Sequence, residues 1–179
     1  MSLRDLLKGT GVALVTPFKE DTSVDYDSLR KLIDFVIAEG VDYLVTLGTT
    51  GETPTLSREE KIEIIQFTFT VNEGRVPVVV GIGGNDTRSL IKEIETFPIE
   101  NAAALLSASP YYNKPSQEGI YQHYKALAAS TAKPIILYNV PARTGSNIEA
   151  ATTIRLANET DNILGIKEAS GNMTQCMQI

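Results

Sequence analysis

Lys167 is the residue whose type and setting most directly predict chemistry. It follows the apolar run 163–166, which we expect to be a strand buried on both faces. A lysine amine attacks a carbonyl carbon only when it is neutral, and an apolar surround favours the neutral form. The sequence therefore admits two interpretations: an ordinary exposed lysine at a strand end, or a nucleophile that forms a Schiff base with a carbonyl substrate.

Other polar residues follow apolar runs at comparable positions. They are Thr49 and Thr50 after 43–47, Tyr112 after 102–106, and Tyr138 and Arg143 after 134–137. A phenol can transfer protons, hydroxyls beside backbone N–H groups can hold a carboxylate, and a guanidinium can bind a carboxylate with paired hydrogen bonds. Each residue type also has a purely structural interpretation. A tyrosine can pack in the core, a threonine can satisfy backbone hydrogen bonds in a turn, and an arginine can be a solvated surface charge. Only their positions relative to one another can separate these interpretations.

The elements that must position these residues alternate regularly along the chain. Short apolar runs predict strands at 12–16, 43–47, 76–80, 102–106, 134–137 and 163–166. Helical patterns lie between them, including 87–96 and 117–129, and capping-box pairs are predicted at Ser57/Glu60, Ser146/Glu149 and Asn172/Gln175. Strict alternation predicts an α/β fold with a parallel sheet covered by helices. In a parallel barrel all the carboxyl ends of the strands open on one face, where barrel active sites lie.

Composition excludes several classes of protein. The formal net charge is −6 and Lys and Arg do not cluster, so no nucleic-acid partner is expected. Cys176 and His123 are the only residues of their types, which excludes an internal disulfide, a thiolate zinc site and a histidine-rich metal site. No apolar run approaches the ~18 residues of a membrane span, and the first residues lack the apolar stretch of a signal peptide. We expect a cytoplasmic protein without membrane association, in which His123 lies on a helix and is structural.

Four motifs, in this order, resemble the dihydrodipicolinate synthase family of pyruvate-dependent class I aldolases. They are the segments 48–52 (GTTGE), 109–119 (SPYYNKPSQEG), 138–145 (YNVPARTG) and 165–169 (GIKEA). The first motif and the lysine are shared with N-acetylneuraminate lyase and related aldolases, whereas Arg143 after Tyr-Asn-Val-Pro is more specific to the synthase. The resemblance implies a (β/α)8 TIM barrel, of which this chain supplies about the first six β/α units.

The resemblance also implies an activity, that of a lyase in diaminopimelate and lysine biosynthesis. Lys167 would form an imine with pyruvate, and the derived enamine would attack the aldehyde of aspartate semialdehyde, giving 4-hydroxy-tetrahydrodipicolinate after ring closure. Tyr138 would act as acid and base in a proton relay with Thr49 and Tyr112. Thr50 would hold the pyruvate carboxylate and Arg143 the carboxylate side of the semialdehyde. No metal or organic cofactor is implied.

The resemblance further implies a homotetramer, a dimer of dimers, in which the tyrosine matching Tyr112 reaches in from the neighbouring subunit. The sequence stops about two turns into the helix predicted after Asn172, whereas a (β/α)8 barrel typically needs ~250 residues. We therefore expect residues 1–179 to belong to a single TIM-barrel domain and to be the N-terminal part of a longer protein. Two alternatives stay open: another pyruvate-type aldolase, such as an N-acetylneuraminate or keto-deoxy-sugar lyase, or an inactive fragment or binding scaffold.

Feedback by lysine is predicted to be weak. The loops that match the family's lysine pocket hold Thr53, Arg58, Lys61, Asn85, Ser89 and Tyr111. Asn85 and Tyr111 match the pattern of sensitive enzymes, but Arg58 and Lys61 stand where some of those enzymes have histidines, and Ser89 stands in place of a glutamate. Added positive charge and a lost carboxylate disfavour a cationic effector.

Overall fold

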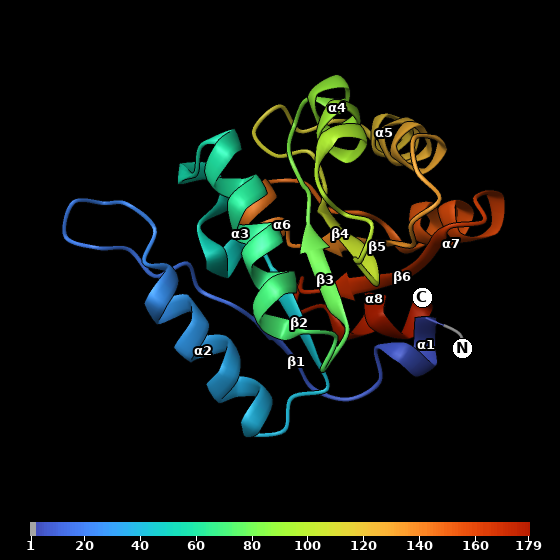
Figure 1. Cartoon of the computed structure of the whole chain (residues 1–179). Coiled ribbons are helices and arrows are strands. Elements are labelled where there is room, and N and C mark those ends of the chain that lie inside the picture. The colour runs from blue at the N-terminus through green and yellow to red at the C-terminus, as the bar shows by residue number, and fades with distance from the viewer. Residues whose placement is uncertain (1–2) are drawn as a thin grey trace. The chain divides into compact units, whose positions relative to one another are not determined.

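The structure, a computed structural model, describes residues 3–179 and divides them into two compact units. The first unit contains the residues up to 81 together with 97–104, and the second contains 82–96 and 105–179. Within each unit, strands and helices alternate along the chain, as Figure 1 shows by colour and label. The predicted alternation of strands and helices is therefore confirmed.

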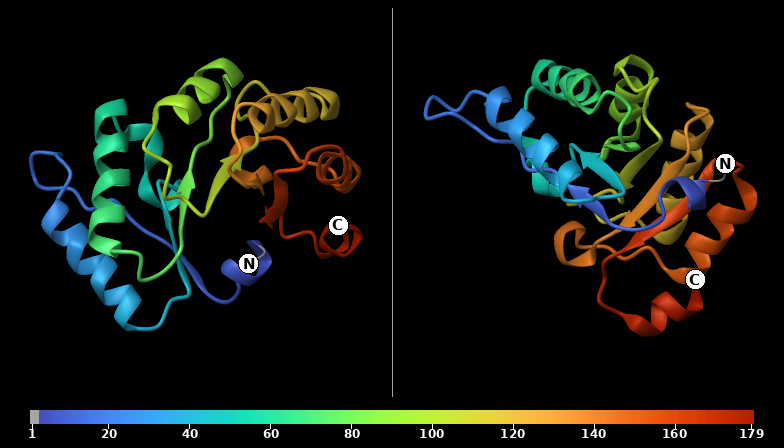
Figure 2. Two further views of the ribbon diagram at one scale, coloured as in Figure 1. Left: turned by 45° about the vertical axis from the view of Figure 1, so that its right-hand side comes forward. Right: turned by 60° about the horizontal axis from the view of Figure 1, so that its bottom comes forward.

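The first unit is built on three parallel strands. They are β1 (Gly11–Ala13), β2 (Tyr43–Thr46) and β3 (Val78–Gly81), and β2 pairs with both of the others. The accompanying elements are α1 (Leu3–Leu6), α2 (Tyr26–Ala38), the 3₁₀ turns η1 (Thr49–Gly51) and η2 (Thr53–Thr55), and α3 (Arg58–Asn72). Helices α2 and α3 lie side by side in Figure 1 and Figure 2. Strand β3 is buried along its whole length, so it is the core strand of this unit.

The start of α3 follows the predicted capping box. The backbone N–H of Glu60 donates to Ser57 Oγ at 3.1 Å, and the backbone N–H of Ser57 donates to Glu60 Oε2 at 2.8 Å. These reciprocal bonds satisfy donors that the first helical turn cannot satisfy itself. The capping box thereby fixes where the chain leaves the loop after β2.

The second unit also has three parallel strands, with β5 paired to both neighbours. They are β4 (Ala104–Ala108), whose first residue lies in the first unit, β5 (Ile135–Asn139) and β6 (Ile163–Glu168). Its helices are α4 (Thr87–Thr96), α5 (Gln117–Ala129), α6 (Pro141–Thr144), α7 (Ala150–Glu159) and α8 (Met173–Gln178). Helix α5 packs against both α4 and α7. Helices α4 and α5 have the predicted boundaries.

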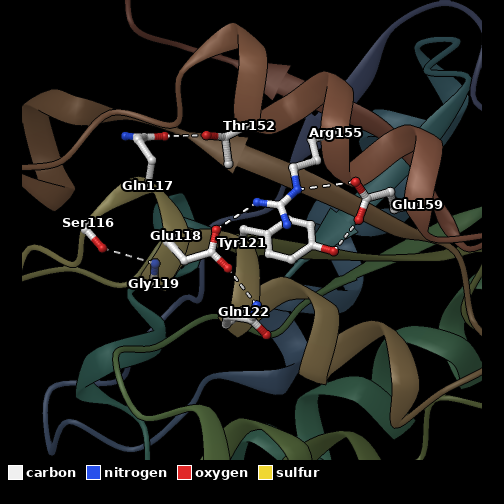
Figure 3. Close-up of polar contacts among 9 residues, drawn as sticks. All are labelled: Ser116, Gln117, Glu118, Gly119, Tyr121, Gln122, Thr152, Arg155 and Glu159. Atoms are coloured by element: carbon white, nitrogen blue, oxygen red, sulfur yellow. Dashed lines mark hydrogen bonds and ion pairs between the residues drawn. The ribbon is translucent and has the colours of Figure 1, made fainter.

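The contact between α5 and α7 combines a buried aromatic ring with surface charges (Figure 3). The Arg155 guanidinium carbon lies 3.5 Å from the centroid of the Tyr121 ring, and the Tyr121 hydroxyl donates to Glu159. Arg155 also donates to Glu118 Oε2 at 2.7 Å. Exposed ion pairs contribute little, so burial of Tyr121, which is 1% exposed, is the larger stabilising contribution. This packing fixes α7, the helix that leads into β6.

The predicted capping box at Ser146/Glu149 is wrong. Helix α7 begins after Glu149, and the Glu149 side chain makes no capping hydrogen bond. Instead, Gln117 of α5 accepts from the backbone N–H of Glu149 at 3.1 Å and from the Thr152 hydroxyl at 2.7 Å. A side chain from a neighbouring helix therefore does what the sequence assigned to a local residue.

Burial along two of the predicted strand runs also differs from the prediction, and the first run is a strand only as far as Ala13. The runs 12–16 and 163–166 were expected to be buried on both faces, but Val15 is 46% exposed and Leu164 is 54% exposed. Strands β5 and β6 are longer than predicted at their carboxyl ends, so Tyr138 and Lys167 lie inside strands and not in the loops after them. The backbone of both residues is held by strand pairing.

Candidate active site

The structure brings Lys167 and Tyr138 together. They lie directly opposite one another on β6 and β5, and Lys167 Nζ is 4.6 Å from the centroid of the Tyr138 ring. Tyr138 is 8% exposed, whereas Lys167 is exposed. A primary amine over the face of a phenol is attracted by the ring when protonated, and it stands beside a hydroxyl that can transfer protons. This pair has the two groups that imine chemistry requires.

A polar cluster lies one residue further along the same two strands. Asn139 and Glu168 are opposite each other, and because strand side chains alternate, they point to the other face from Tyr138 and Lys167. Asn139 Nδ2 donates to Glu168 Oε2 at 2.9 Å. Gln175 of α8 donates to the same oxygen at 2.8 Å. We call Asn139, Glu168 and Gln175 the strand-end cluster.

The charge of the strand-end cluster resides on Glu168. Partial burial alone would raise the pKa of this carboxyl, but hydrogen bonds from Asn139, Ser170 and Gln175 together outweigh it and lower the pKa below its ordinary value. The backbone N–H of Ser170 donates to Glu168 Oε1 at 2.7 Å. Glu168 is therefore held as a carboxylate by neutral donors.

Tyr112 lies in a strained turn after β4. Its φ is +71°, and the backbone N–H of Asn113 donates to the carbonyl oxygen of Tyr111 at 2.9 Å, which makes Tyr112 the centre of a γ-turn with positive φ. Such turns are rare and cost energy for a residue other than glycine. Asn85 stabilises the turn, since its Nδ2 donates to the Tyr111 carbonyl at 3.2 Å. The Tyr112 side chain is 89% exposed.

Arg143 lies on the short helix α6, next to the Tyr112 turn. The backbone N–H of Tyr112 donates to the carbonyl oxygen of Thr144 at 3.4 Å, so the two loops are hydrogen-bonded to each other. Gly145 ends α6 with a φ of +72°, and a side chain there would lie 2.9 Å from Lys114 Cε. Arg143 is exposed and has no ion-pair partner among residues 3–179. Its guanidinium is thus available to an anion.

Thr49 and Thr50 belong to the first unit, where η1 carries them directly after β2. The loop is fixed through its backbone, because the Thr53 hydroxyl donates to Leu47 O at 2.7 Å and the Thr16 hydroxyl donates to Gly51 O at 2.7 Å. Both threonines are exposed. Their predicted placement in a tight loop after a strand is confirmed, and the relay that would join Thr49 to Tyr138 and Tyr112 stays a prediction.

His123 lies on α5, as predicted. Its ring is 4% exposed, and Nδ1 is 2.8 Å from the Thr87 hydroxyl at the start of α4. Burial lowers the pKa of His123 from 6.5 to about 4, so the ring is neutral at physiological pH. It joins two helices in the second unit.

Sequence patterns alone assign no role to the strand-end cluster. Glu168 and Asn139 stand there only within longer motifs, and Gln175 is predicted to complete a capping box with Asn172. Asn172 does cap α8, since its side chain accepts from the backbone N–H of Gln175 at 3.2 Å, but the Gln175 side chain turns inward and is 6% exposed. The available signal was the position of Asn139 and Glu168, each one residue beyond a predicted reactive residue.

These observations describe an α/β protein with an amine and a phenol paired at the carboxyl ends of parallel strands. The chain matches the Dihydrodipicolinate synthetase family over residues 6–179 and belongs to this family. It is 61% identical over 169 residues to the 4-hydroxy-tetrahydrodipicolinate synthase of Parabacteroides distasonis, covering 94% of this chain and 57% of that relative. It is 56% identical to the synthase of the same name from Cytophaga hutchinsonii, with 96% and 57% covered.

A solved structure supports the same assignment. The crystal structure of the chloride inhibited dihydrodipicolinate synthase from Acinetobacter baumannii, complexed with pyruvate, matches with a TM-score of 0.91 and 46% identity, covering 94% of this chain and 58% of that one. The predicted fold class, a TIM-barrel α/β fold represented here by six β/α units, is therefore confirmed. The chain spans about 57% of the length of the curated relatives it matches.

Residues 3–179 contain neither a candidate membrane span nor a cluster of metal-ligating side chains. No helix in this range has both the length and the apolar character needed to cross a bilayer. No group of three or more His, Cys, Asp or Glu side chains in the same range is arranged to hold a metal ion.

Proposed function

We propose that this chain carries the Schiff-base chemistry of a 4-hydroxy-tetrahydrodipicolinate synthase, which condenses pyruvate with aspartate semialdehyde. The contact between Lys167 Nζ and the Tyr138 ring, at 4.6 Å, is the observation that carries the proposal. The names of the relatives and the pyruvate in the Acinetobacter baumannii enzyme support the choice of reaction and substrate.

The first half of the proposed reaction takes place at Lys167. Its neutral amine attacks the keto carbon of pyruvate to give a carbinolamine, and Tyr138 donates the proton with which the hydroxyl leaves as water, forming the imine. The Tyr138 phenolate then takes a proton from the pyruvate methyl group, which gives the enamine and restores the phenol. Thr50 binds the pyruvate carboxylate through its hydroxyl and the neighbouring backbone N–H groups.

The second half joins the two substrates. The enamine carbon attacks the aldehyde of aspartate semialdehyde, whose carboxylate Arg143 binds, and the new alkoxide receives a proton through Tyr138. The semialdehyde amine then attacks the imine carbon, closes the ring and releases the Lys167 amine. Thr49 and Tyr112 complete the relay that returns the proton to Tyr138. The proposed reaction uses no metal or organic cofactor.

The proposal includes assembly as a dimer of dimers in the cytoplasm. Tyr112 supports it, because a strained turn presents a tyrosine that is 89% exposed, the arrangement expected of a side chain that completes the site of a neighbouring copy. We also propose that residues 1–179 belong to one barrel domain. Weak feedback by lysine stays a prediction, to which the structure adds that the Ser89 hydroxyl donates to Asp86 Oδ2 at 2.6 Å.

A comparison of substrates tests the proposed function. The protein is expressed from its complete reading frame and assayed for condensation of pyruvate with aspartate semialdehyde, and separately for release of pyruvate from N-acetylneuraminate and from a keto-deoxy sugar acid. We expect kcat/KM for aspartate semialdehyde to exceed the values for both sugar acids by a factor on the order of 100 or more. Faster cleavage of either sugar acid would reassign the enzyme within the aldolases, and no turnover of any of the three would remove the assignment as an aldolase.

A further inference from the structure

The pairing of β6 with β5 changes register just after it begins. Ile135 lies opposite Ile163, but Ile136 lies opposite Gly165, so Leu164 has no partner on β5. This extra residue is a β-bulge, and a shift of one residue moves every later side chain of a strand to the opposite face. The bulge therefore decides which face of the sheet Lys167 occupies.

The register after the bulge is held by few groups. After the bulge, β6 extends only to Glu168. The one pair of opposite residues beyond Tyr138 and Lys167 is Asn139 with Glu168. A slip of β6 by one residue would place Lys167 or Ala169 opposite Asn139. Neither side chain can accept the hydrogen bond that Asn139 Nδ2 now gives to Glu168 Oε2 at 2.9 Å. This bond therefore discriminates between the observed register and its nearest alternatives.

The Asn139 side-chain amide is hydrogen-bonded at both its oxygen and its nitrogen. It is fully buried, its Oδ1 accepts from the backbone N–H of Ile148 at 2.9 Å, and its Nδ2 also donates to Asn147 Oδ1 at 2.8 Å. Breaking its bond to Glu168 would leave a buried donor partly unsatisfied, which costs more than the bond itself is worth. Asn139 is thus a rigid reference point on β5.

Gln175 completes the arrangement from α8. Its Nε2 donates to Glu168 Oε2 at 2.8 Å, and its Oε1 accepts from Asn147 Nδ2 at 2.8 Å. Gln175 is 6% exposed, and none of its side-chain hydrogen bonds in the described part of the chain goes to Lys167 or Tyr138. A residue outside the sheet thus restrains the last position of β6.

The same bonds keep Glu168 away from the amine. Its carboxylate oxygens accept from Asn139, Gln175 and the backbone of Ser170, and no cation pairs with it in the described part of the chain. Because Glu168 points to the other face of the sheet from Lys167, these bonds hold its carboxylate apart from the amine. The strand-end cluster therefore leaves Lys167 open to a carbonyl substrate.

We propose that Asn139, Glu168 and Gln175 are positioning residues, which lock the shifted register of β6 and so hold Lys167 over Tyr138. The proposal rests on the proposed Schiff-base function, because it assigns these residues to the preparation of that amine. They act through the strand and through Lys167, and they touch no reacting atom.

The test changes Gln175 in the protein expressed from its complete reading frame, which alters its bonds to Asn147 and Ile148 together with the one to Glu168. Gln175→Met removes the donor to Glu168 at nearly constant volume, and Gln175→Glu sets two carboxylates against each other. Asn162→Ala is the matched control, because Asn162 is a hydrogen-bonded amide at the other end of the same strand.

The main readout is the rate at which borohydride traps pyruvate on Lys167, measured over a range of pyruvate concentrations. We expect the maximal rate to fall about 10-fold in Gln175→Met and by more in Gln175→Glu, with half-saturating pyruvate changed by less than about 3-fold. Asn162→Ala should lower stability and leave the trapping rate within about 2-fold of wild type.

A second readout does not depend on pyruvate. Acetic anhydride is reacted in trace amounts with each folded variant, and the extent of acetylation of Lys167 is compared with that of the other lysines by peptide mass mapping. We expect the relative reactivity of Lys167 to change in Gln175→Met and Gln175→Glu and to be unchanged in Asn162→Ala.

The two readouts distinguish a failure of the proposed function from a failure of the proposed positioning role. If the wild-type protein traps no pyruvate on Lys167, the proposed function is wrong, and the acetylation result alone decides the positioning role. If folded Gln175→Met and Gln175→Glu match wild type in both readouts, or lose no more than Asn162→Ala, the positioning role is wrong. Should Gln175→Glu fail to fold, Gln175→Met decides by the same criteria.

Discussion

The two ends of β6 use side-chain amides in different ways. At the amino end, Asn162 Nδ2 donates to the backbone carbonyls of Ala128, Thr131 and Lys133, at 3.0, 2.7 and 3.3 Å. At the carboxyl end, Asn139 donates to another side chain, Glu168, directly beyond the pair of Tyr138 and Lys167.

This difference indicates that the amino end of β6 contributes to stability, whereas the carboxyl end positions the reactive amine. Bonds to backbone carbonyls fasten the chain but set the orientation of no other side chain. Bonds between side chains across β5 and β6 set the register, and the register sets the orientation of the amine. We therefore expect changes at the amino end to alter the free energy of unfolding, and changes at the carboxyl end to alter the reaction.

Replacing Lys167 should give the largest effect of any change at the carboxyl end. Lys167→Arg keeps the positive charge over the Tyr138 ring but removes the nucleophile, because an arginine is not deprotonated in proteins. We expect kcat/KM to fall by roughly 10⁴ or more and the urea midpoint of unfolding to stay near that of wild type. Lys133→Arg, at the amino-end loop, is the control. Substantial activity in Lys167→Arg would show that another group carries the reaction.

Removing the Tyr138 hydroxyl should have the next largest effect. Tyr138→Phe keeps the ring beneath Lys167 and deletes only the proton donor, so kcat should fall about 10²- to 10³-fold with little change in pyruvate binding. Tyr26→Phe, whose hydroxyl donates to Glu63 on a helix of the first unit, should leave kcat unchanged. Equal losses in the two variants would contradict a role for the Tyr138 hydroxyl in proton transfer.

Acid should destabilise the second unit through His123. This residue lies on α5 and belongs to neither end of β6. Because the pKa of His123 is about 4 in the folded chain and 6.5 ordinarily, the unfolded chain takes up the proton first as the pH falls. Stability is unaffected above pH 6.5 and decreases from pH 6.5 to about 4, by up to ~3 kcal/mol. Urea unfolding of wild type and His123→Gln across this range checks it. Parallel pH dependence in the two proteins would contradict the assignment.

The smallest expected effect on the reaction comes from the amino end. Asn162→Ala leaves backbone carbonyls without a donor and should lower the free energy of unfolding by about 1–3 kcal/mol. We expect kcat to change less than about 2-fold, since no reactive side chain depends on this residue. If Asn162→Ala lost as much kcat as Tyr138→Phe, the two ends of β6 would not differ in their roles.

The positions of the strands could be predicted because each is an apolar run between turn signals. Their carboxyl ends could not, because Tyr138, Asn139, Lys167 and Glu168 are polar or amphipathic and look like loop residues once the apolar run stops. Strand pairing overrides that local preference. Leu164 was expected to be buried, but the bulge leaves it without a partner, and no pattern in the run 163–166 indicates where a bulge falls.

The candidate site could be predicted only as far as residue types allow. Lysine, tyrosine and arginine carry their chemistry in their side chains, so Lys167, Tyr138 and Arg143 were selected. The roles of Asn139 and Gln175 depend on register and on a helix that turns one side chain inward. These are tertiary properties, and for this reason Gln175 was predicted to be a capping residue and Asn139 was given no role.

The most direct test of the account is reduction of the protein with borohydride in the presence of pyruvate, followed by peptide mass mapping. We expect one pyruvate-derived label, on Lys167, which is absent in Lys167→Arg and forms more slowly in Tyr138→Phe. A label on any other lysine of the wild-type protein, or an undiminished label in Lys167→Arg, would contradict the account.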